Sequence, residues 1–249
     1  TGLTHDRPAA SLAFQWTSNP GEFFNVERSL NLERDSWELL ANRMPAVTGA
    51  AETSFVVENL AVEGRAFYRI VRAGAPPILE EGFEGEVTGW IAGEGTVPFP
   101  NGAGTRWEVG LPTTGPGAAR TGQNVYGTGL ASDYEDLANL TLRSPLIDLT
   151  GKLSAELSFW YFLEAGDQEG GVVEFLDGDD PTVILTQTGL LPSTPGGWEE
   201  RVVDLKKAGE NGELSLLGSR FYIQFHFLSD DRSADNGAGL FIDDVVIDD

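Results

Sequence analysis

Short apolar or alternating stretches, separated by turn residues, recur along the whole chain and predict β-strands. Between residues 11 and 73 they are "SLAFQW", "EFFNVERSL", "WELLANRM", "TSFVVENL" and "AFYRIVRA". Further strand patterns follow to the end of the chain, and no segment has a sustained helical period. The roughly ten strands expected after residue 78 are what a two-sheet jelly roll requires. The predicted fold class is therefore all-β, with two tandem β-sandwiches of which the second is a jelly roll.

The segment "AGAPPI" (residues 73–78) separates the two groups of strands. Its two prolines cannot continue a hydrogen-bonded ladder and favour a stiff, extended connection. The sequence thus predicts four parts in order. They are an N-terminal extension (1–10), a small β-sandwich (11–73), a proline-rich linker (74–77) and the jelly roll (78–249).

Two predicted strands have faces that can be assigned from the period of two. In "FYIQFHF", Phe221, Ile223, Phe225 and Phe227 form an apolar face. In "LSFWYFL", the corresponding face has Leu157, Phe159, Tyr161 and Leu163. The opposite faces carry Trp160, Tyr222, Gln224 and His226, which are candidates for a platform that stacks sugar rings.

An alternative is that these four side chains pack beneath the glycine- and proline-rich stretch between residues 89 and 134. That stretch is too long for a hairpin loop and must be either functional or pinned to the fold.

The chain ends on "GLFIDDVVIDD", a predicted buried strand with Asp243 and Asp244 in its middle. Regular alternation places Val245 and Ile247 on the side of Asp243, and Val246 on the side of Asp244. Two adjacent carboxylates in a buried strand are costly without partners. A solvated edge position, or an arginine such as Arg106 or Arg220, would be the ordinary explanation.

Charge narrows the class of partner. Acidic residues outnumber basic ones 39 to 16, for a formal net charge of −23, so nucleic acids and anionic lipid surfaces are repelled at long range. No apolar run is long enough to span a bilayer, and the N-terminus lacks the pattern of a signal peptide. The absence of cysteine excludes disulfides. Acidity, many glycines and no cysteine favour an exported bacterial protein, extracellular or at the cell surface.

Motifs for catalysis are missing from the sequence. The chain has two histidines and contains neither a His-Glu-x-x-His nor a Gly-x-Ser-x-Gly motif. Carboxylate pairs carry no weight in so acidic a chain. The sequence therefore favours a protein that is not an enzyme.

Residues 78–249 resemble the MAM-like, concanavalin-like jelly rolls of bacterial secreted proteins, including those attached to immune-inhibitor-A-type metalloproteases. The matching segments are "EEGFEGEVTGW" (80–90), "RWEVGLPTTGPGAARTGQNVYGTGLASDY" (106–134), "LTLRSPLIDLTG" (140–151), "AELSFWYF" (155–162), "WEERVVDL" (198–205) and "GLFIDDVVI" (239–247). Residues 11–73 resemble a small sandwich module of large exported proteins of the Verrucomicrobia and Planctomycetes type. Animal MAM domains are cross-linked by cysteines, which this chain lacks.

The resemblance implies a structural Ca²⁺ between the first and last strands of the jelly roll. Carried onto this sequence, its ligands are Glu84 and Asp243, with Asp244 as second choice and Asn124 and Asp133 as further donors. Carboxylates and amide or carbonyl oxygens are what Ca²⁺ prefers. A metal that joins residues so far apart in sequence would close a very long loop.

Three functions are compatible with these features. The favoured one is a non-catalytic extracellular binding or adhesion module, stabilised by Ca²⁺, whose partner is a polysaccharide or a cell-surface protein. The second is a self-assembling subunit of an extracellular filament or surface layer, whose partners are copies of itself. The third is an accessory domain of a secreted hydrolase or metalloprotease.

Overall fold

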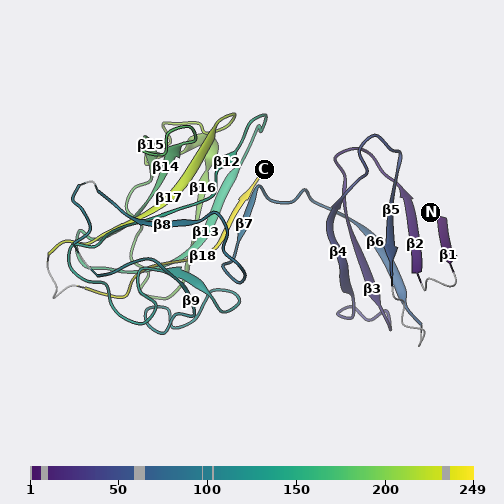
Figure 1. Cartoon of the computed structure of the whole chain (residues 1–249), viewed down its shortest axis with the longest axis horizontal. Coiled ribbons are helices and arrows are strands. Elements are labelled where there is room, and N and C mark those ends of the chain that lie inside the picture. The colour runs from purple at the N-terminus through teal and green to yellow at the C-terminus, as the bar shows by residue number, and fades with distance from the viewer. Residues whose placement is uncertain (1, 7–10, 59–64, 97, 103, 232–235) are drawn as a thin grey trace. The chain divides into compact units, whose positions relative to one another are not determined.

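The computed structural model describes residues 2–6, 11–58, 65–96, 98–102, 104–231 and 236–249, with side chains from residue 11 onward. The chain divides into two compact units, Thr1–Pro76 and Pro77–Asp249 (Figure 1). Each unit is built from β-strands in two sheets, which confirms the all-β fold class with tandem sandwiches. The described residues contain no helix that is long and apolar enough to cross a membrane.

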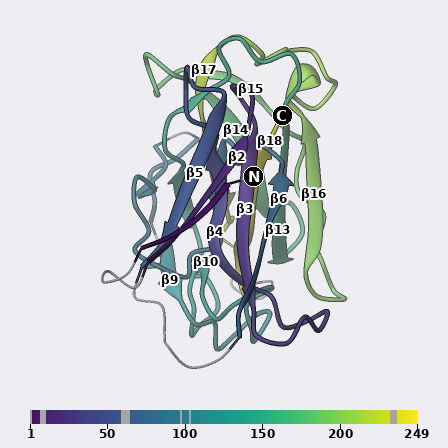
Figure 2. The ribbon, with the colours of Figure 1, turned by 90° about the vertical axis from the view of Figure 1, so that its right-hand side faces the viewer.

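The first unit packs two three-stranded sheets on each other (Figures 1 and 2). One has the order β1 (Gly2–Asp6), β2 (Ser11–Thr17), β5 (Glu52–Val57), and the other β4 (Glu38–Pro45), β3 (Phe23–Ser29), β6 (Phe67–Ala73). Trp16 of β2 and Phe24 of β3 meet edge to face with ring centroids 5.4 Å apart, so the core joins both sheets. Residues 2–6 were expected in an extension, but they pair with β2 as an outer strand.

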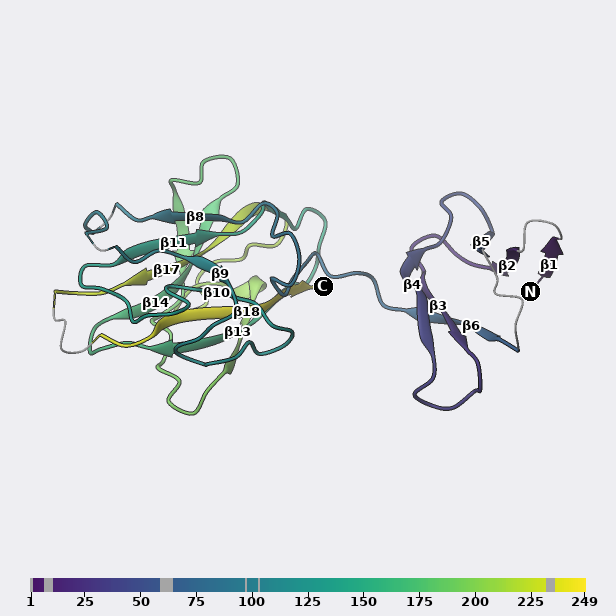
Figure 3. The ribbon, with the colours of Figure 1, turned by 60° about the horizontal axis from the view of Figure 1, so that its bottom comes forward.

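The second unit packs two six-stranded sheets, which Figure 3 shows as two layers. The β18 sheet has the order β16 (Glu199–Asp204), β13 (Glu156–Glu164), β18 (Gly239–Asp248), β10 (Val125–Gly127), β9 (Glu108–Gly110), and β7 (Leu79–Glu81) also pairs with β18. The β17 sheet has the order β15 (Ile184–Gln187), β14 (Gly170–Asp177), β17 (Arg220–Leu228), β11 (Asn139–Arg143), β8 (Ile91–Glu94), and β12 (Ile147–Asp148) also pairs with β17. A short 3₁₀ helix, η1 (Leu205–Lys207), follows β16.

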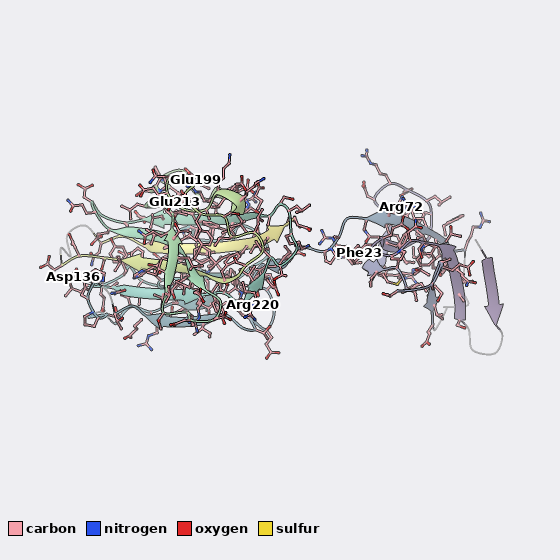
Figure 4. All side chains as sticks on the ribbon, turned by 90° about the horizontal axis from the view of Figure 1, so that it is seen from above. Phe23, Arg72, Asp136, Glu199, Glu213 and Arg220 are labelled. Atoms are coloured by element: carbon pink, nitrogen blue, oxygen red, sulfur yellow. The ribbon has the colours of Figure 1, made fainter. Side chains whose placement is uncertain are left out.

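The core of the second unit lies between these sheets, where side chains fill the space (Figure 4). The predicted apolar faces of β17 and β13 are both buried in it, which confirms those assignments. Phe225 of β17 and Phe159 of β13 meet edge to face at 5.0 Å between centroids. Burial of large aromatic rings from both layers supplies the main driving force for this unit.

The aromatic contact between the sheets gives the first prediction. Phe225→Ala should lower the free energy of unfolding by about 3–5 kcal/mol, because it removes a fully buried ring and leaves a cavity. Leu153→Ala, at a side chain that is 88% exposed, should change it by less than about 0.5 kcal/mol. Denaturant unfolding of the full chain measures both. Similar values for the two variants would contradict the assigned core.

Candidate functional site

The aspartate pair of β18 forms a β-bulge. Ser158 of β13 lies opposite Val246, and Trp160 lies opposite Asp243. Between these two pairs β18 therefore contains one residue more than β13. Asp244 has a φ of 47°, the left-handed conformation that bulges often use.

The bulge reverses the side-chain alternation of β18. Val245 and Ile247 therefore join Leu240 and Ile242 in the main core, while Phe241 belongs to a separate cluster. The prediction that Val245 and Ile247 share the side of Asp243 is wrong, because it assumed an unbroken period of two.

Asp243 is fully buried and is bound by backbone N–H groups. Its Oδ2 accepts hydrogen bonds from the N–H groups of Arg120 (2.9 Å) and Thr121 (3.2 Å), and its Oδ1 from that of Asp244 (2.8 Å). Burial raises the pKa of Asp243 to about 6, the Asp244 carboxylate also raises it, and the three N–H groups lower it. Neither ordinary explanation, a solvated edge position or an arginine such as Arg106 or Arg220, describes Asp243, because main-chain N–H groups bind its buried carboxylate.

Glu84 binds the same loop a few residues further on. Its Oε1 accepts hydrogen bonds from the N–H groups of Gln123 (2.8 Å) and Asn124 (2.7 Å). Thr121 Oγ1 donates to Asp244 Oδ1 at 2.7 Å. Carboxylates from the beginning and the end of the second unit therefore bind one segment, residues 118–124, which we name the strap.

The strap covers part of the outer face of the β18 sheet. Beneath it lies a small apolar cluster of Val125, Ala238 and Phe241, with Ala119, Leu130, Phe162 and Trp198 packed against it. Trp198 Nε1 donates to the carbonyl of Ala118 at 3.1 Å, and the Arg120 guanidinium lies 4.0 Å from the centroid of the Trp160 ring. The long stretch between residues 89 and 134 is therefore pinned here to the sheet.

The four predicted platform residues do not come together. Trp160 lies on β13 of the β18 sheet, under Arg120, whereas Tyr222, Gln224 and His226 lie on β17 of the other sheet. The outer faces of two stacked sheets point in opposite directions, so one ligand platform cannot include both groups. Trp160 instead follows the alternative prediction, because it lies beneath Arg120 of the long stretch between residues 89 and 134.

The predicted Ca²⁺ ligands are partly brought together. Glu84, Asp243 and Asp244 all contact the strap, and such hard oxygens suit Ca²⁺. Asn124 joins through its backbone N–H, while Asp133 lines a different cavity with Glu108 and Glu135. Within the described residues, no group of three or more His, Cys, Asp or Glu side chains is placed to hold one ion. Any Ca²⁺ here would need backbone carbonyls and water to complete its coordination.

The outer face of the β17 sheet forms a groove of about 910 Å³, which we name the sheet groove. A polar row crosses four strands on its floor, because Arg143 of β11 pairs with Gln224 of β17, Gln224 with Glu174 of β14, and Glu174 with Gln187 of β15. The rest of the lining is mixed, and its aliphatic side chains include Val172, Leu176, Ile184, Leu190 and Leu228.

A hydrogen-bonded network fixes the floor of the sheet groove. His226 Nδ1 lies 2.9 Å from Glu174 Oε1, and Nε2 lies 2.8 Å from Asn139 Oδ1. Asn139 Nδ2 donates to the carbonyl of Phe99, and Gln224 Nε2 donates to Glu174 Oε2 at 2.7 Å. Both imidazole nitrogens thus lie within hydrogen-bonding distance of an oxygen of a neighbouring strand, so the ring is held between Glu174 and Asn139.

Sequence reasoning found Gln224 and His226 but missed Arg143, Glu174 and Asn139. Asn139 and Arg143 lie on β11, whose polar and apolar residues alternate, so its outward face was readable. Glu174 lies on β14, where Val172 and Leu176 share its face, so the pattern gave no such signal. Their convergence depends on which strands are neighbours, which a single sequence does not reveal.

The contact between Gly122 and Glu84 gives the second prediction. A Cβ at Gly122 (φ 61°) would lie 2.2 Å from Glu84 Cδ, whereas one at Gly117 (φ 67°) in the preceding loop would meet nothing within 4 Å. Gly122→Ala should therefore cost about 1–3 kcal/mol more than Gly117→Ala, since the Glu84 hydrogen bonds are lost as well. Denaturant unfolding and amide exchange at Gln123 and Asn124 measure this. Equal effects would show that the strap does not depend on Glu84.

No family model matches the chain. It is 30% identical over 172 residues to Bacillopeptidase F of Bacillus subtilis (strain 168), a match that covers 68% of this chain and 10% of that protein. The chain thus spans about a tenth of the length of this relative.

Two solved structures that are similar to the chain have low sequence identity to it. The K1 cleaved adhesin domain of Lys-gingipain from Porphyromonas gingivalis W83 is 18% identical, with a TM-score of 0.43 over 68% of this chain and 96% of that one. The family 11 carbohydrate-binding module from Clostridium thermocellum, in complex with a β-1,3-1,4-mixed-linked tetrasaccharide, is 13% identical, with a TM-score of 0.42 over 68% of this chain and 92% of that one.

Proposed function

We propose that the second unit is a non-catalytic module that binds a polysaccharide chain in the sheet groove. The observation that carries this proposal is the polar row of Arg143, Gln224, Glu174 and Gln187 on the groove floor. Amide, guanidinium and carboxylate groups in line offer donors and acceptors to successive sugar hydroxyls. A groove on a sheet face, as opposed to a closed pocket, suits a polymer that enters and leaves at both ends.

The lining of the sheet groove favours recognition by hydrogen bonds over ring stacking. Its described residues include no aromatic ring except the His226 imidazole, and the Tyr222 ring is instead faced by Arg143, 5.2 Å away. Glu174 already accepts one hydrogen bond from Gln224 and faces His226, which supports a binding role for the floor and not a catalytic acid.

The third prediction tests this binding surface. In affinity electrophoresis of the full chain through gels that contain neutral or acidic glycans, at least one glycan should retard migration. Gln224→Ala should weaken that retardation by about tenfold, through the loss of hydrogen bonds to the ligand and to Glu174. Trp160→Phe, on the opposite sheet, should leave it unchanged. The absence of retardation by every glycan, or loss caused by Trp160→Phe alone, would overturn the proposal.

A setting within a larger exported protein is also part of the proposal. The relative Bacillopeptidase F is about ten times longer than the matched segment, which supports the interpretation that this unit accompanies other domains. We place it outside the cell or at the cell surface. In that setting a binding module holds its carrier near a polysaccharide or a surface.

We further propose that Glu84 and Asp243 hold a structural Ca²⁺ beside the strap, with Asp244 in support. The convergence of these carboxylates on residues 120–124 supports the position. When bound, the ion would supply positive charge to two carboxylates that otherwise depend on backbone N–H groups.

The fourth prediction tests the ion. The melting temperature of the full chain should rise when a chelator is replaced by Ca²⁺, with a stabilisation of about 2.7 kcal/mol at a free concentration of 100 times Kd. Glu84→Gln should remove the Ca²⁺ dependence, whereas Asp133→Asn, in the separate cavity, should retain it. An unchanged melting temperature in wild type would mean that the N–H groups alone hold the strap.

A further inference from the structure

We infer that the polysaccharide bound in the sheet groove carries carboxylate groups, as a uronic acid polymer does, and that Arg143 receives one of them. This inference rests on the proposed function of the groove and names the class of its ligand.

Arg143 is a cation with unused hydrogen-bonding capacity. Arg28, Arg69, Arg72, Lys152 and Arg220 each contact a carboxylate. Among the described residues no carboxylate pairs with Arg143, and its buried Nε has no hydrogen-bond partner. Its guanidinium instead lies over the Tyr222 ring. Arg143 therefore presents, at the floor of the groove, a guanidinium that no described carboxylate neutralises, and a carboxylate of the ligand would do so.

The neighbouring acid on the floor does not compete for this role. Glu174 is one position away from Gln224 in the row, and both of its oxygens are engaged, by His226 and by Gln224. Two further acids, Glu94 and Glu210, line the groove, but neither is part of the polar row. Arg143 is therefore the charged member of the polar row that has no oppositely charged partner among the described residues.

The contact between Arg143 and the Tyr222 ring also suits recognition of a carboxylate. An arginine whose guanidinium already contacts an aromatic ring, here at 5.2 Å from the ring centroid, has less rotational freedom to lose when the ligand arrives. Its planar fork can then form two parallel hydrogen bonds to one carboxylate, a geometry that a sugar hydroxyl cannot match.

The net charge of −23 removes one trivial explanation for binding of an anionic polymer. An anionic polymer is repelled by the protein as a whole, so retention by such a polymer cannot arise from diffuse electrostatic attraction. Retention would have to come from a local cationic site.

The experiment is affinity electrophoresis of the full chain in gels that contain polygalacturonate, alginate, or polygalacturonate whose carboxyl groups have been reduced. Variants are Arg143→Gln, Arg143→Lys and, as a matched charge control, Arg201→Gln on the exposed edge strand β16 of the other sheet. We expect one of the uronates to retard wild type and the reduced polymer to be without effect. Arg143→Gln should weaken binding by about tenfold or more, as for one charge-assisted hydrogen bond, and Arg143→Lys by less. Arg201→Gln should bind as wild type does.

Other outcomes distinguish failure of the carboxylate specificity from failure of polysaccharide binding altogether. Equal retardation by reduced and unreduced polymer, or an Arg143→Gln variant that melts normally and binds the uronate normally, would overturn the inference and leave the polysaccharide groove standing. If neither these polymers nor neutral glycans retard wild type, the proposed function fails, and the inference with it.

Discussion

The hydrogen bonds from the backbone N–H groups of Arg120 and Thr121 to the buried Asp243 carboxylate hold the strap on the outer face of the β18 sheet. They require the carboxylate to face outward from β18, and the bulge at Asp244 allows this while Val245 and Ile247 stay in the core. The strap then covers part of the outer face of the β18 sheet. The outer face of the other sheet carries the groove.

Much of this fold could be predicted from the sequence because side chains alternate along a strand without reference to anything distant. Phe221, Ile223, Phe225 and Phe227 were assigned to the core on that basis and lie there. The same rule failed at Val245 and Ile247. A bulge adds one residue to a strand, and here it accompanies hydrogen bonds from Asp243 to a loop more than 100 residues earlier, such as the bond from the Arg120 N–H. A local pattern does not contain that information.

The candidate site divides in the same way. The outward position of Gln224 and His226 follows from the strand pattern, and so does that of Trp160, but membership of a sheet is a long-range property. Trp160 was therefore grouped with Tyr222, Gln224 and His226, although they lie on the other sheet of the sandwich. Arg143 and Glu174 were missed for the converse reason, because β11 and β14 meet β17 only once the chain has folded.

Asn139 binds the segment that forms one wall of the sheet groove at three points. Its carbonyl accepts the N–H of Gly95 (2.8 Å), its side chain donates to the Phe99 carbonyl, and its own N–H donates to Asn101 Oδ1 (3.1 Å). Its side-chain oxygen also faces His226 on the floor. These bonds hold the described residues Gly95, Phe99 and Asn101 to the floor before any ligand arrives, so less affinity would be lost to the ordering of these residues on binding.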